Sequence, residues 1–357
     1  MVSRETMRLK GYTGENYLHN LSWNHARRFT LLVMLHRLKK PDPLIVLILT
    51  AVAIAIIAPA RGTFADVFGS LTNVAIALLF FLYGARLSTQ EALNGLKHWR
   101  LHLTILEFTF VIYPLIGLAL QPLTGFITDD MYMGILFLTL VPSTVQSSVA
   151  FTYIAKGNVP GAIVSASTSN LAGVFITPVL VMLLMGTGTG LHIDTSVFGE
   201  ISLLLLAPFV LGQLTRRWIA DLAQSKATKV VDRGSIAMVV YSAFSKGVVD
   251  GIWSSISAWE IVFLVVFAAA FVIFMLWLTR FISRKLGFSR ADTIAIQFCG
   301  SKKSLATGLP MASVIFASGQ TSLGLLILPL MIYHQVQLMI CSLLASRYAQ
   351  QDEEQLH

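Results

Sequence analysis

Two adjacent lysines stand at the centre of an apolar stretch that is long enough to cross a membrane. The stretch runs from Ala291 to Phe316 and reads ADTIAIQFCGSKKSLATGLPMASVIF, with Lys302 and Lys303 in its middle. At about 1.5 Å per residue, a helix of this length crosses a hydrocarbon layer of about 30 Å, so the lysines fall near the midplane. An ammonium group there is costly unless it is paired or faces a polar cavity. The sequence therefore predicts a helix that is broken inside the membrane, with its polar break turned inward.

Composition places the chain among polytopic helical membrane proteins. Of its 357 residues, 55% are hydrophobic and 12% are charged, whereas soluble domains have about 25% charged residues. The formal net charge of +8 does not indicate nucleic acid, because the basic residues lie in short loops between apolar stretches and set membrane topology. Cys299 and Cys341 form neither a disulfide framework nor a zinc spacing. No H-E-x-x-H, G-x-S-x-G or P-loop spacing occurs, so we expect no enzyme and no cofactor.

Ten apolar stretches are predicted to span the membrane. They cover residues 44–59, 70–87, 101–120, 132–155, 159–185, 197–214, 234–249, 258–282, 291–316 and 322–344. If the N-terminus is cytoplasmic, the loops on the cytoplasmic side hold nearly all lysines and arginines, and the opposite side holds only Arg61. This asymmetry follows the positive-inside rule, so both termini are expected in the cytoplasm.

The chain is predicted to consist of an extension, one transporter unit and a tail. Residues 1–40 form a polar, basic N-terminal extension without a spanning stretch or a signal peptide, and we expect it in the cytoplasm, with Met34 as an alternative start. Residues 41–348 form the unit, and residues 349–357 form a polar C-terminal tail. The linker GTGTGLHIDTS divides the unit into halves at 41–186 and 195–348, with five spans each. An odd number of spans inserts the second half upside down, which is the inverted-repeat plan of many secondary transporters.

The fourth predicted span has a polar centre that corresponds to the lysine pair of the ninth. Its segment LTLVPSTVQSSVAFTYIA carries Pro142 followed by hydroxyl and amide side chains. This pattern favours a second broken helix over a proline kink with back-bonded serines. Broken helices expose N–H groups that attract anions, and neither break contains a carboxylate, so the lysines favour an anionic ligand over a bare sodium ion. The candidate substrate- or ion-binding residues are Ser143, Thr144, Gln146, Ser147, Ser148, Gln297, Ser301, Lys302, Lys303, Ser304 and His334.

Other interpretations of the intramembrane polar residues stay open. Instead of holding an anion, the lysines either snorkel to one membrane surface or occupy a cation site themselves and hold the crossing together. Glu107 in the third span is a possible cavity partner for one of them. The serine-rich segment 165–170 is more typical of helix packing than of ligand contacts. His334 is typical of a hydrogen-bonded structural histidine, with a proton relay as the alternative.

Several motifs resemble those of the bile acid:sodium symporter family, which is solute carrier family 10. The motifs AIALLFFLYGARLS, HWRLHL, FCGSKKSLA and LPLMIYHQVQLM resemble a bacterial branch related to the seventh human member, and the resemblance covers residues 43–347. It implies an all-α polytopic membrane protein of ten transmembrane helices in two inverted five-helix repeats. It also implies that broken helices 4 and 9 cross at their unwound centres, and that a panel domain rocks against a core domain.

The resemblance also carries over binding positions. The family's sodium positions fall on Ser147, Ser148, Ala162, Ala166 and Gln297, the family's crossing Gln and Asn fall on Ser301 and Lys302, and its tenth-helix His falls on His334. An acid is thus replaced by an amide and two hydroxyls are replaced by methyls, although hard cations need several oxygen ligands. We therefore predict no confident metal site and no sodium coupling by the family's route, and coupling to sodium, to protons or to neither stays open.

These observations predict secondary active transport of a small organic anion by alternating access. The alternative is a membrane regulator that keeps a transporter fold without moving substrate. The expected location is the inner membrane of a bacterium. The expected partners are a small organic anion and the lipid bilayer but no nucleic acid, and the chain is expected to be a monomer or a weak homodimer.

Overall fold

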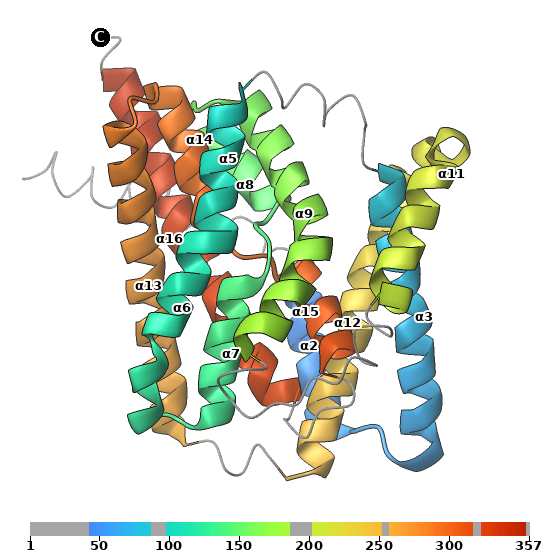
Figure 1. The fold of residues 1–357 in the computed structure, drawn as a ribbon. Helices are drawn as coiled ribbons and strands as arrows, with labels where there is room; N and C mark the ends of the chain where they lie inside the picture. Colours follow the sequence, from blue (N-terminus) through green and yellow to red (C-terminus); the bar gives the residue numbers. More distant parts are fainter. Residues whose placement is uncertain (1–42, 87–97, 186–201, 252–256, 317–322, 355–357) are drawn as a thin grey trace, which may run out of the picture. The chain divides into compact units, whose positions relative to one another are not determined.

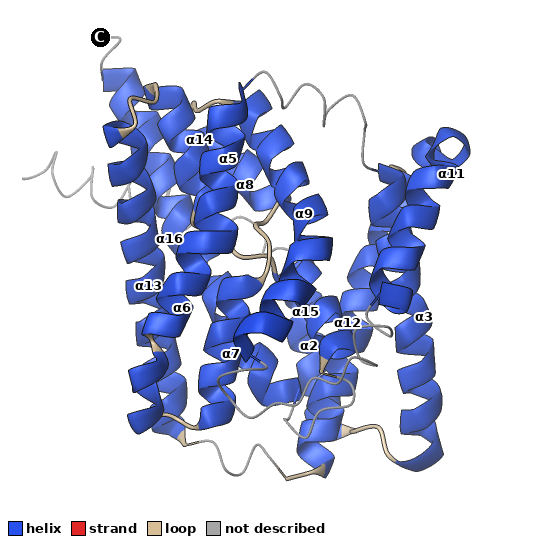
Figure 2. Cartoon of the chain, in the orientation of Figure 1, coloured by secondary structure: helices blue, strands red, loops and turns tan. Residues whose placement is uncertain are grey.

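The structure is a computed structural model that describes residues 43–86, 98–185, 202–251, 257–316 and 323–354. All regular elements in these ranges are helices, in agreement with the predicted all-α class (Figure 2). The predicted extension at 1–40 and most of the glycine-rich linker lie outside the described residues. The chain divides into two units, Met1–Leu47 and Ile48–His357, and the second unit contains every described helix from Gly62 onward.

Among the described residues, five continuous helical stretches are long and apolar enough to cross a membrane. They are Gly62–Arg86, Trp99–Gly125, Val159–Met185, Ala258–Lys285 and Leu323–Gln351. These stretches contain all or most of the predicted second, third, fifth, eighth and tenth spans, and Gly62–Arg86 begins eight residues earlier than predicted. The described part of the chain is therefore that of a polytopic helical membrane protein.

The helices follow the order of the predicted spans (Figure 1). Those of the first half are α2 (Pro43–Ile57), α3 (Gly62–Arg86), α5 (Trp99–Glu107), the π-helical turn η2 (Phe108–Ile112), α6 (Tyr113–Ala119), the short 3-10 turn η3 (Gln121–Gly125), α7 (Asp129–Leu140), α8 (Gln146–Ile154) and α9 (Val159–Met185). Those of the second half are the π-helical turn η4 (Ser202–Leu206), α11 (Ala207–Ala223), α12 (Lys226–Val249), α13 (Ala258–Lys285), α14 (Arg290–Gly300), α15 (Leu305–Ile315) and α16 (Leu323–Glu354).

Several helices run further than their apolar stretches predict, and α12 and α16 show why. Helix α12 begins at Lys226 rather than at residue 234, and α16 continues past residue 344 to Glu354. The added segments are rich in Lys, Ala, Arg, Gln and Glu, which are good helix formers. Hydropathy marks where a helix enters lipid, whereas helix propensity decides where the helix itself ends.

The fourth predicted span is broken at Pro142. Helix α7 ends at Leu140, and Val141 has an extended backbone with φ −78° and ψ 155°. A residue that precedes a proline is driven out of the helical region, and the proline itself has no N–H to donate. Helix α8 then restarts at Gln146. The prediction of a broken helix in this span is confirmed.

The ninth predicted span is broken without a proline. Helix α14 ends at Gly300, and α15 begins at Leu305 after the segment Ser301–Ser304. The restart is capped, because the Ser304 hydroxyl accepts a hydrogen bond from the Thr307 backbone N–H at 3.2 Å. Serine is among the best N-cap residues, so this serine favours a new helix start at that point. This break is also confirmed, and it contains both lysines.

Helix α3 packs against both α11 and α12, and its backbone comes especially close to that of α11. A Cβ atom on Gly84 of α3 would collide with the carbonyl oxygen of Phe209, and one on Gly212 of α11 would collide with that of Phe81. Two glycines thus allow the backbones to touch, as small residues do between membrane helices. At one end of these helices, the Arg86 guanidinium donates to the Asp232 carboxylate at 2.6 Å and to the Ala223 carbonyl at 2.7 Å.

Candidate functional site

The two breaks lie against each other and are joined by hydrogen bonds. The Ser304 backbone N–H donates to the Pro142 carbonyl at 2.8 Å, which links the two interruptions directly. The Ser143 hydroxyl donates to the Cys299 carbonyl at 2.5 Å, and the Ser148 hydroxyl donates to the Phe298 carbonyl at 3.0 Å. The broken segments of two helices far apart in sequence therefore form one polar centre, which we call the crossing.

Lys303 has a fully buried side chain that is held by backbone oxygens. Its Nζ donates to the carbonyls of Thr109 at 2.8 Å, Thr139 at 2.7 Å and Val141 at 2.9 Å. Three acceptors require three N–H hydrogens, which only the protonated amine supplies. The same nitrogen lies 4.2 Å from the centre of the Tyr113 ring, whose π face attracts a cation. Lys303 is thus an ammonium group in a cage of three carbonyls and one aromatic ring.

The cage is built by irregular backbone in two different helices. In η2, the Tyr113 N–H bonds to Phe108 O instead of Thr109 O, so the π-helical turn leaves the Thr109 carbonyl available. Thr139 and Val141 lie at the C-terminal end of α7, where helix carbonyls lose their partners and the helix dipole is negative. The lysine neutralises this end and satisfies its carbonyls, which is the role that the sequence left open as a cation site occupied by lysine.

The backbone of Lys303 is clamped by α16. Gln337 is fully buried; its Nε2 donates to the Lys303 carbonyl at 2.8 Å, and its Oε1 accepts from the Lys303 N–H at 3.0 Å. His334 Nδ1 lies 2.8 Å from Gln337 Nε2 and 3.3 Å from the Lys303 carbonyl. His334 is therefore part of the crossing, and its observed contacts are those of a hydrogen-bonded structural residue.

Lys302 is equally buried but has a different environment. Its Nζ has no hydrogen-bond partner within the described ranges. It lies 3.9 Å from the centre of the Phe151 ring and 5.8 Å from that of Phe298. Two aromatic faces give a cation some stabilisation, but they leave all N–H groups of the amine unsatisfied.

At the C-terminal end of α14, the donors to the backbone carbonyls are hydroxyl groups and not an ammonium group. The Ser301 carbonyl accepts from the Tyr113 hydroxyl at 2.5 Å and from the Tyr333 hydroxyl at 3.1 Å. The Ser301 hydroxyl in turn donates to the Gln297 carbonyl at 2.5 Å. The Gln297 side chain donates to the Leu276 carbonyl at 2.8 Å and accepts from the Tyr348 hydroxyl at 2.8 Å. Each of these buried polar groups therefore has a partner from the protein itself.

Asn170 joins three elements at the crossing. Its Nδ2 donates to the Ser143 carbonyl at 2.7 Å, and its Oδ1 accepts from the Thr307 hydroxyl at 2.7 Å. Nearby, the Ser169 hydroxyl accepts from the Ser143 N–H at 3.2 Å. The segment 165–170 of α9, which the sequence assigned to helix packing, thus binds the first break directly.

Only part of the predicted site is open to the surroundings. Ser143, Thr144, Ser148, Gln297, Ser301 and Ser304 are buried, whereas Gln146 is exposed and Ser147 is half-buried. Ser147 and Ser148 share the Thr144 hydroxyl, each at 2.8 Å. The accessible polar groups therefore gather at the N-terminal end of α8, where backbone N–H groups and the positive end of the helix dipole favour an anion.

Glu107 does not pair with either lysine. Its side chain is exposed on α5, and the described residues contain one ion pair, between Arg86 and Asp232. In the same residues, no group of three or more His, Cys, Asp or Glu side chains is placed to hold a metal ion. The positive charges of the crossing are therefore not balanced by a carboxylate within the described structure.

Residues 42–350 match the profile of the SBF-like CPA transporter family. The chain belongs to this family. It is 48% identical over 319 residues to an uncharacterised protein of Pseudomonas aeruginosa, PA2026, with 88% of this chain and 95% of that protein covered. It is 45% identical over 317 residues to the Escherichia coli protein named "Putative symporter YfeH", with 88% and 94% covered. It is 34% identical over 284 residues to the rat sodium/bile acid cotransporter 7, with 77% and 82% covered.

Membership of this transporter family agrees with the predicted resemblance and with the expectation that the chain is no enzyme. The positions onto which the resemblance carried sodium ligands offer few free oxygens here. Ala162 and Ala166 are fully buried methyl side chains, and both ends of the Gln297 amide are engaged within the protein. Ser148 donates its hydroxyl hydrogen to a backbone carbonyl. We predicted no metal site at these positions, and this stays a prediction.

Sequence reasoning missed Gln337, Asn170, Tyr113 and Tyr333 as members of the crossing. Gln337 and Asn170 are amides within apolar spans, and that signal was available in the sequence. The two tyrosines gave no such signal, because an aromatic residue in a membrane span is ordinarily interpreted as an apolar residue. Their hydroxyl groups lie 2.6 Å apart beneath Ser301, an arrangement that only the fold brings about.

Proposed function

We propose that this chain is a secondary active transporter of a small organic anion that works by alternating access. The observation that carries the proposal is the presence of two fully buried lysines at the crossing of two broken helices, without an acidic partner among the described residues. Membership of a transporter family supports the general activity. A site that holds positive charge without a carboxylate is suited to an anion.

The architecture that we infer has ten spans in two inverted repeats of five, in the inner membrane of a bacterium and with both termini in the cytoplasm. The order of described elements supports it, since the fourth predicted span of each half is the broken one, as α7 and α8 in the first half and as α14 and α15 in the second. The distribution of lysines and arginines supports the orientation. Helix α3, with α11 and α12 packed against it, is the part that we expect to move against the crossing.

The two lysines have separate roles in this mechanism. Lys303 serves as a built-in cation that holds α7, η2 and the second break together, and its three hydrogens are already donated. Lys302 supplies positive potential, because a buried charge without a counter-ion acts over several ångströms in a medium of low dielectric constant. The anion contacts the accessible groups Gln146 and Ser147 at the start of α8.

Transport by this chain is not expected to need sodium. The relatives from rat and other vertebrates are named sodium/bile acid cotransporters, but here the Lys303 ammonium already lies among the carbonyls of the crossing. Transport is then either coupled to protons or driven by the gradient of the anion alone.

The test is uptake by the purified full-length protein in liposomes. Labelled small carboxylates, sulfonates and organic phosphates are presented with an inward gradient of sodium, with an inward gradient of protons, and with neither. We expect saturable uptake of at least one anion class that is independent of sodium, and a weaker apparent affinity in Lys302→Met. Lys246→Met is the matched control, because Lys246 is exposed on α12.

The alternative function is a membrane regulator that keeps the transporter fold. It predicts no saturable flux for any anion under any of the three gradients. That result, obtained with protein shown to be folded in the same liposomes, contradicts transport.

A further inference from the structure

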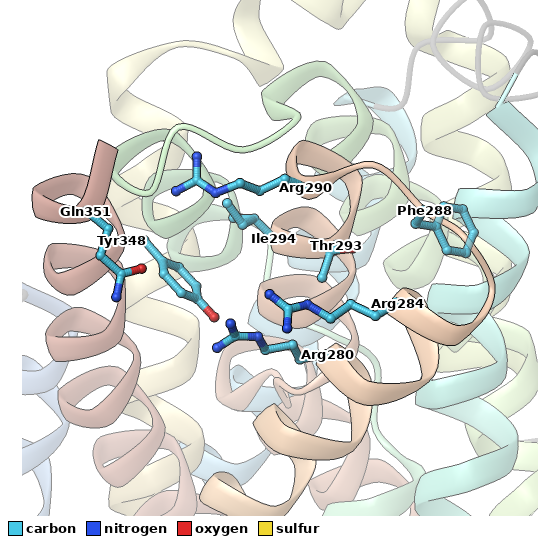
Figure 3. Close-up of a pocket in the computed structure, with 8 residues that line it drawn as sticks. All are labelled: Arg280, Arg284, Phe288, Arg290, Thr293, Ile294, Tyr348 and Gln351. Carbon is cyan, nitrogen blue, oxygen red and sulfur yellow. The ribbon is translucent and has the colours of Figure 1, made fainter. Parts of the chain in front are cut away.

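A basic pocket lies away from the crossing, between α13, α14 and α16 (Figure 3). Its volume is about 450 Å³, and it is lined by Arg280, Arg284, Phe288, Arg290, Thr293, Ile294, Tyr348 and Gln351. Three of the eight lining residues are arginines and none is acidic. This end of the three helices is the one at which the basic loops predict the cytoplasmic membrane surface.

The guanidinium groups are presented toward a common space. Figure 3 shows those of Arg280, Arg284 and Arg290 around the pocket, from two different helices. The Arg280 guanidinium lies 5.5 Å from the centre of the Tyr348 ring, which fixes it against the pocket wall. The Arg284 guanidinium makes no hydrogen bond or ion pair with any described residue. At least one fork of N–H donors is therefore available to a ligand.

A buried hydroxyl group in the pocket wall is a second, independent sign of a ligand. Thr293 is only 5% exposed, and its Oγ1 has no hydrogen-bond partner in the described ranges. A buried polar atom without a partner is uncommon, because it costs about 1–3 kcal/mol. A ligand oxygen in the pocket would satisfy it.

The nearest acidic side chain on α14 is already engaged elsewhere. Asp292 accepts from the Asn158 amide at 2.7 Å and from the Ser289 hydroxyl at 2.8 Å. Its two oxygens thus hold the loop before α9 and the N-terminal end of α14. This carboxylate therefore does not neutralise Arg284.

We propose that this pocket binds a phosphate group, carried either by an anionic phospholipid or by a soluble phosphate compound. Planar guanidinium groups match phosphate oxygens in bidentate fashion, and basic pockets between membrane helices at the cytoplasmic surface hold lipid headgroups. The volume exceeds that of a phosphate group and leaves room for the small polar group attached to it. Thr293 donates to one phosphate oxygen, and Arg284 holds the others.

Occupancy of the pocket is coupled to the crossing through one side chain. Tyr348 lines the pocket, and its hydroxyl donates to Gln297, which in turn donates to the Leu276 carbonyl of α13. A ligand that holds α13, α14 and α16 together binds the native state and not the unfolded chain, so it raises the melting temperature. The site therefore has a readout that does not depend on transport or on the identity of the transported anion.

The experiment measures thermal unfolding of the full-length protein in detergent as a probe is titrated. One arm adds dioleoylphosphatidylglycerol, with dioleoylphosphatidylcholine as the zwitterionic comparison, and the other adds inorganic pyrophosphate. The variants are Arg284→Gln and Thr293→Val. Lys285→Gln is the matched control, because this neighbour on α13 lies over the Phe281 ring and does not line the pocket.

We expect stabilisation of the wild type by phosphatidylglycerol or pyrophosphate but not by phosphatidylcholine. Arg284→Gln should weaken the effective probe by about tenfold and Thr293→Val by about fivefold, while Lys285→Gln stays within about twofold. Stabilisation by the lipid that pyrophosphate does not displace identifies a headgroup site, and pyrophosphate binding that displaces the lipid identifies a soluble phosphate. Equal affinity in wild type and Arg284→Gln, or no response to either probe, overturns the proposal.

Discussion

Lys302 and Lys303 are neighbours in the chain and both are fully buried, but the structure treats them in opposite ways. Lys303 donates to three backbone carbonyls and lies on a tyrosine ring, whereas Lys302 lies between two phenylalanine rings without a hydrogen-bond partner among the described residues. Burial is the same for the two, so burial alone does not tell a structural charge from a functional one. The number of satisfied N–H groups makes the distinction.

This difference shows how the two helix ends at the crossing are closed by groups of the protein itself. The C-terminal end of α7 needs a positive charge and donors for its carbonyls, and a lysine provides both. The C-terminal end of α14 is closed by neutral hydroxyl groups instead. Lys302 donates to the carbonyls of neither end, and in the proposed mechanism its charge acts on the transported anion.

Lys303→Met should have the largest effect on stability. The substitution leaves three buried carbonyls without donors and removes the charge that opposes the α7 dipole, for a loss of about 3 kcal/mol or more in the free energy of unfolding. Chemical unfolding in detergent micelles measures it. Lys302→Met is the control at the adjacent position, and an equal loss in both variants would remove the distinction between the two lysines.

Lys302→Met should change function more than stability. Methionine fills the same space between Phe151 and Phe298 and removes an unsatisfied charge, which offsets the lost cation–π contact, so stability should stay within about 1 kcal/mol. The affinity for the transported anion should fall by about 1–3 kcal/mol. Uptake in liposomes and unfolding of the same preparation measure the two quantities. Unchanged uptake with lowered stability would reverse the roles proposed here.

Gln337→Leu should have an intermediate effect, because its amide holds both backbone groups of Lys303. We expect a loss of about 2 kcal/mol in the free energy of unfolding from the unpaired N–H and carbonyl. Gln335→Leu is the matched control on the same helix, since Gln335 is only half-buried and takes no part in the crossing. Similar losses at both positions would show that general packing of α16, and not the clamp on Lys303, explains the effect.

Ser143→Ala should have the smallest effect of the series. It removes one neutral donor from the Cys299 carbonyl at the α14 end, for about 1 kcal/mol. Melting curves of this variant and of Lys303→Met, recorded side by side, compare closure by a hydroxyl with closure by an ammonium. If the serine variant is the less stable of the two, the ranking of the two helix ends is wrong.

The sequence was sufficient to predict the two breaks and much less informative about their contacts. Pro142 and the lysine pair are local signals that act through backbone chemistry, so the interruptions could be located to within a few residues. The partners of Lys303 could not be predicted, because Thr109 O becomes available only through a π-helical turn and Thr139 O only through the end of α7. Backbone carbonyls carry no sequence signal at all.

Glu107, in contrast, was predicted as a possible partner for a buried lysine that the structure does not show. A carboxylate in an apolar span is a reasonable partner for a buried lysine by sequence, yet the rotation of α5 exposes it. Helix rotation depends on packing against neighbouring helices, which apolar patterning resolves poorly in a membrane because lipid-facing and protein-facing residues are both apolar.

In the proposed mechanism, the Lys303 ammonium occupies the place of a cation at the crossing. Thermal unfolding of wild type and of Lys303→Ala is to be compared in sodium chloride, in choline chloride at equal ionic strength, and with added methylammonium. The wild type should unfold at the same temperature in all three, because a cation that does not bind the native state cannot stabilise it. Lys303→Ala should be destabilised and then partly restored by methylammonium or sodium. Strong stabilisation of the wild type by sodium, or no rescue of the variant by either cation, would contradict the claim.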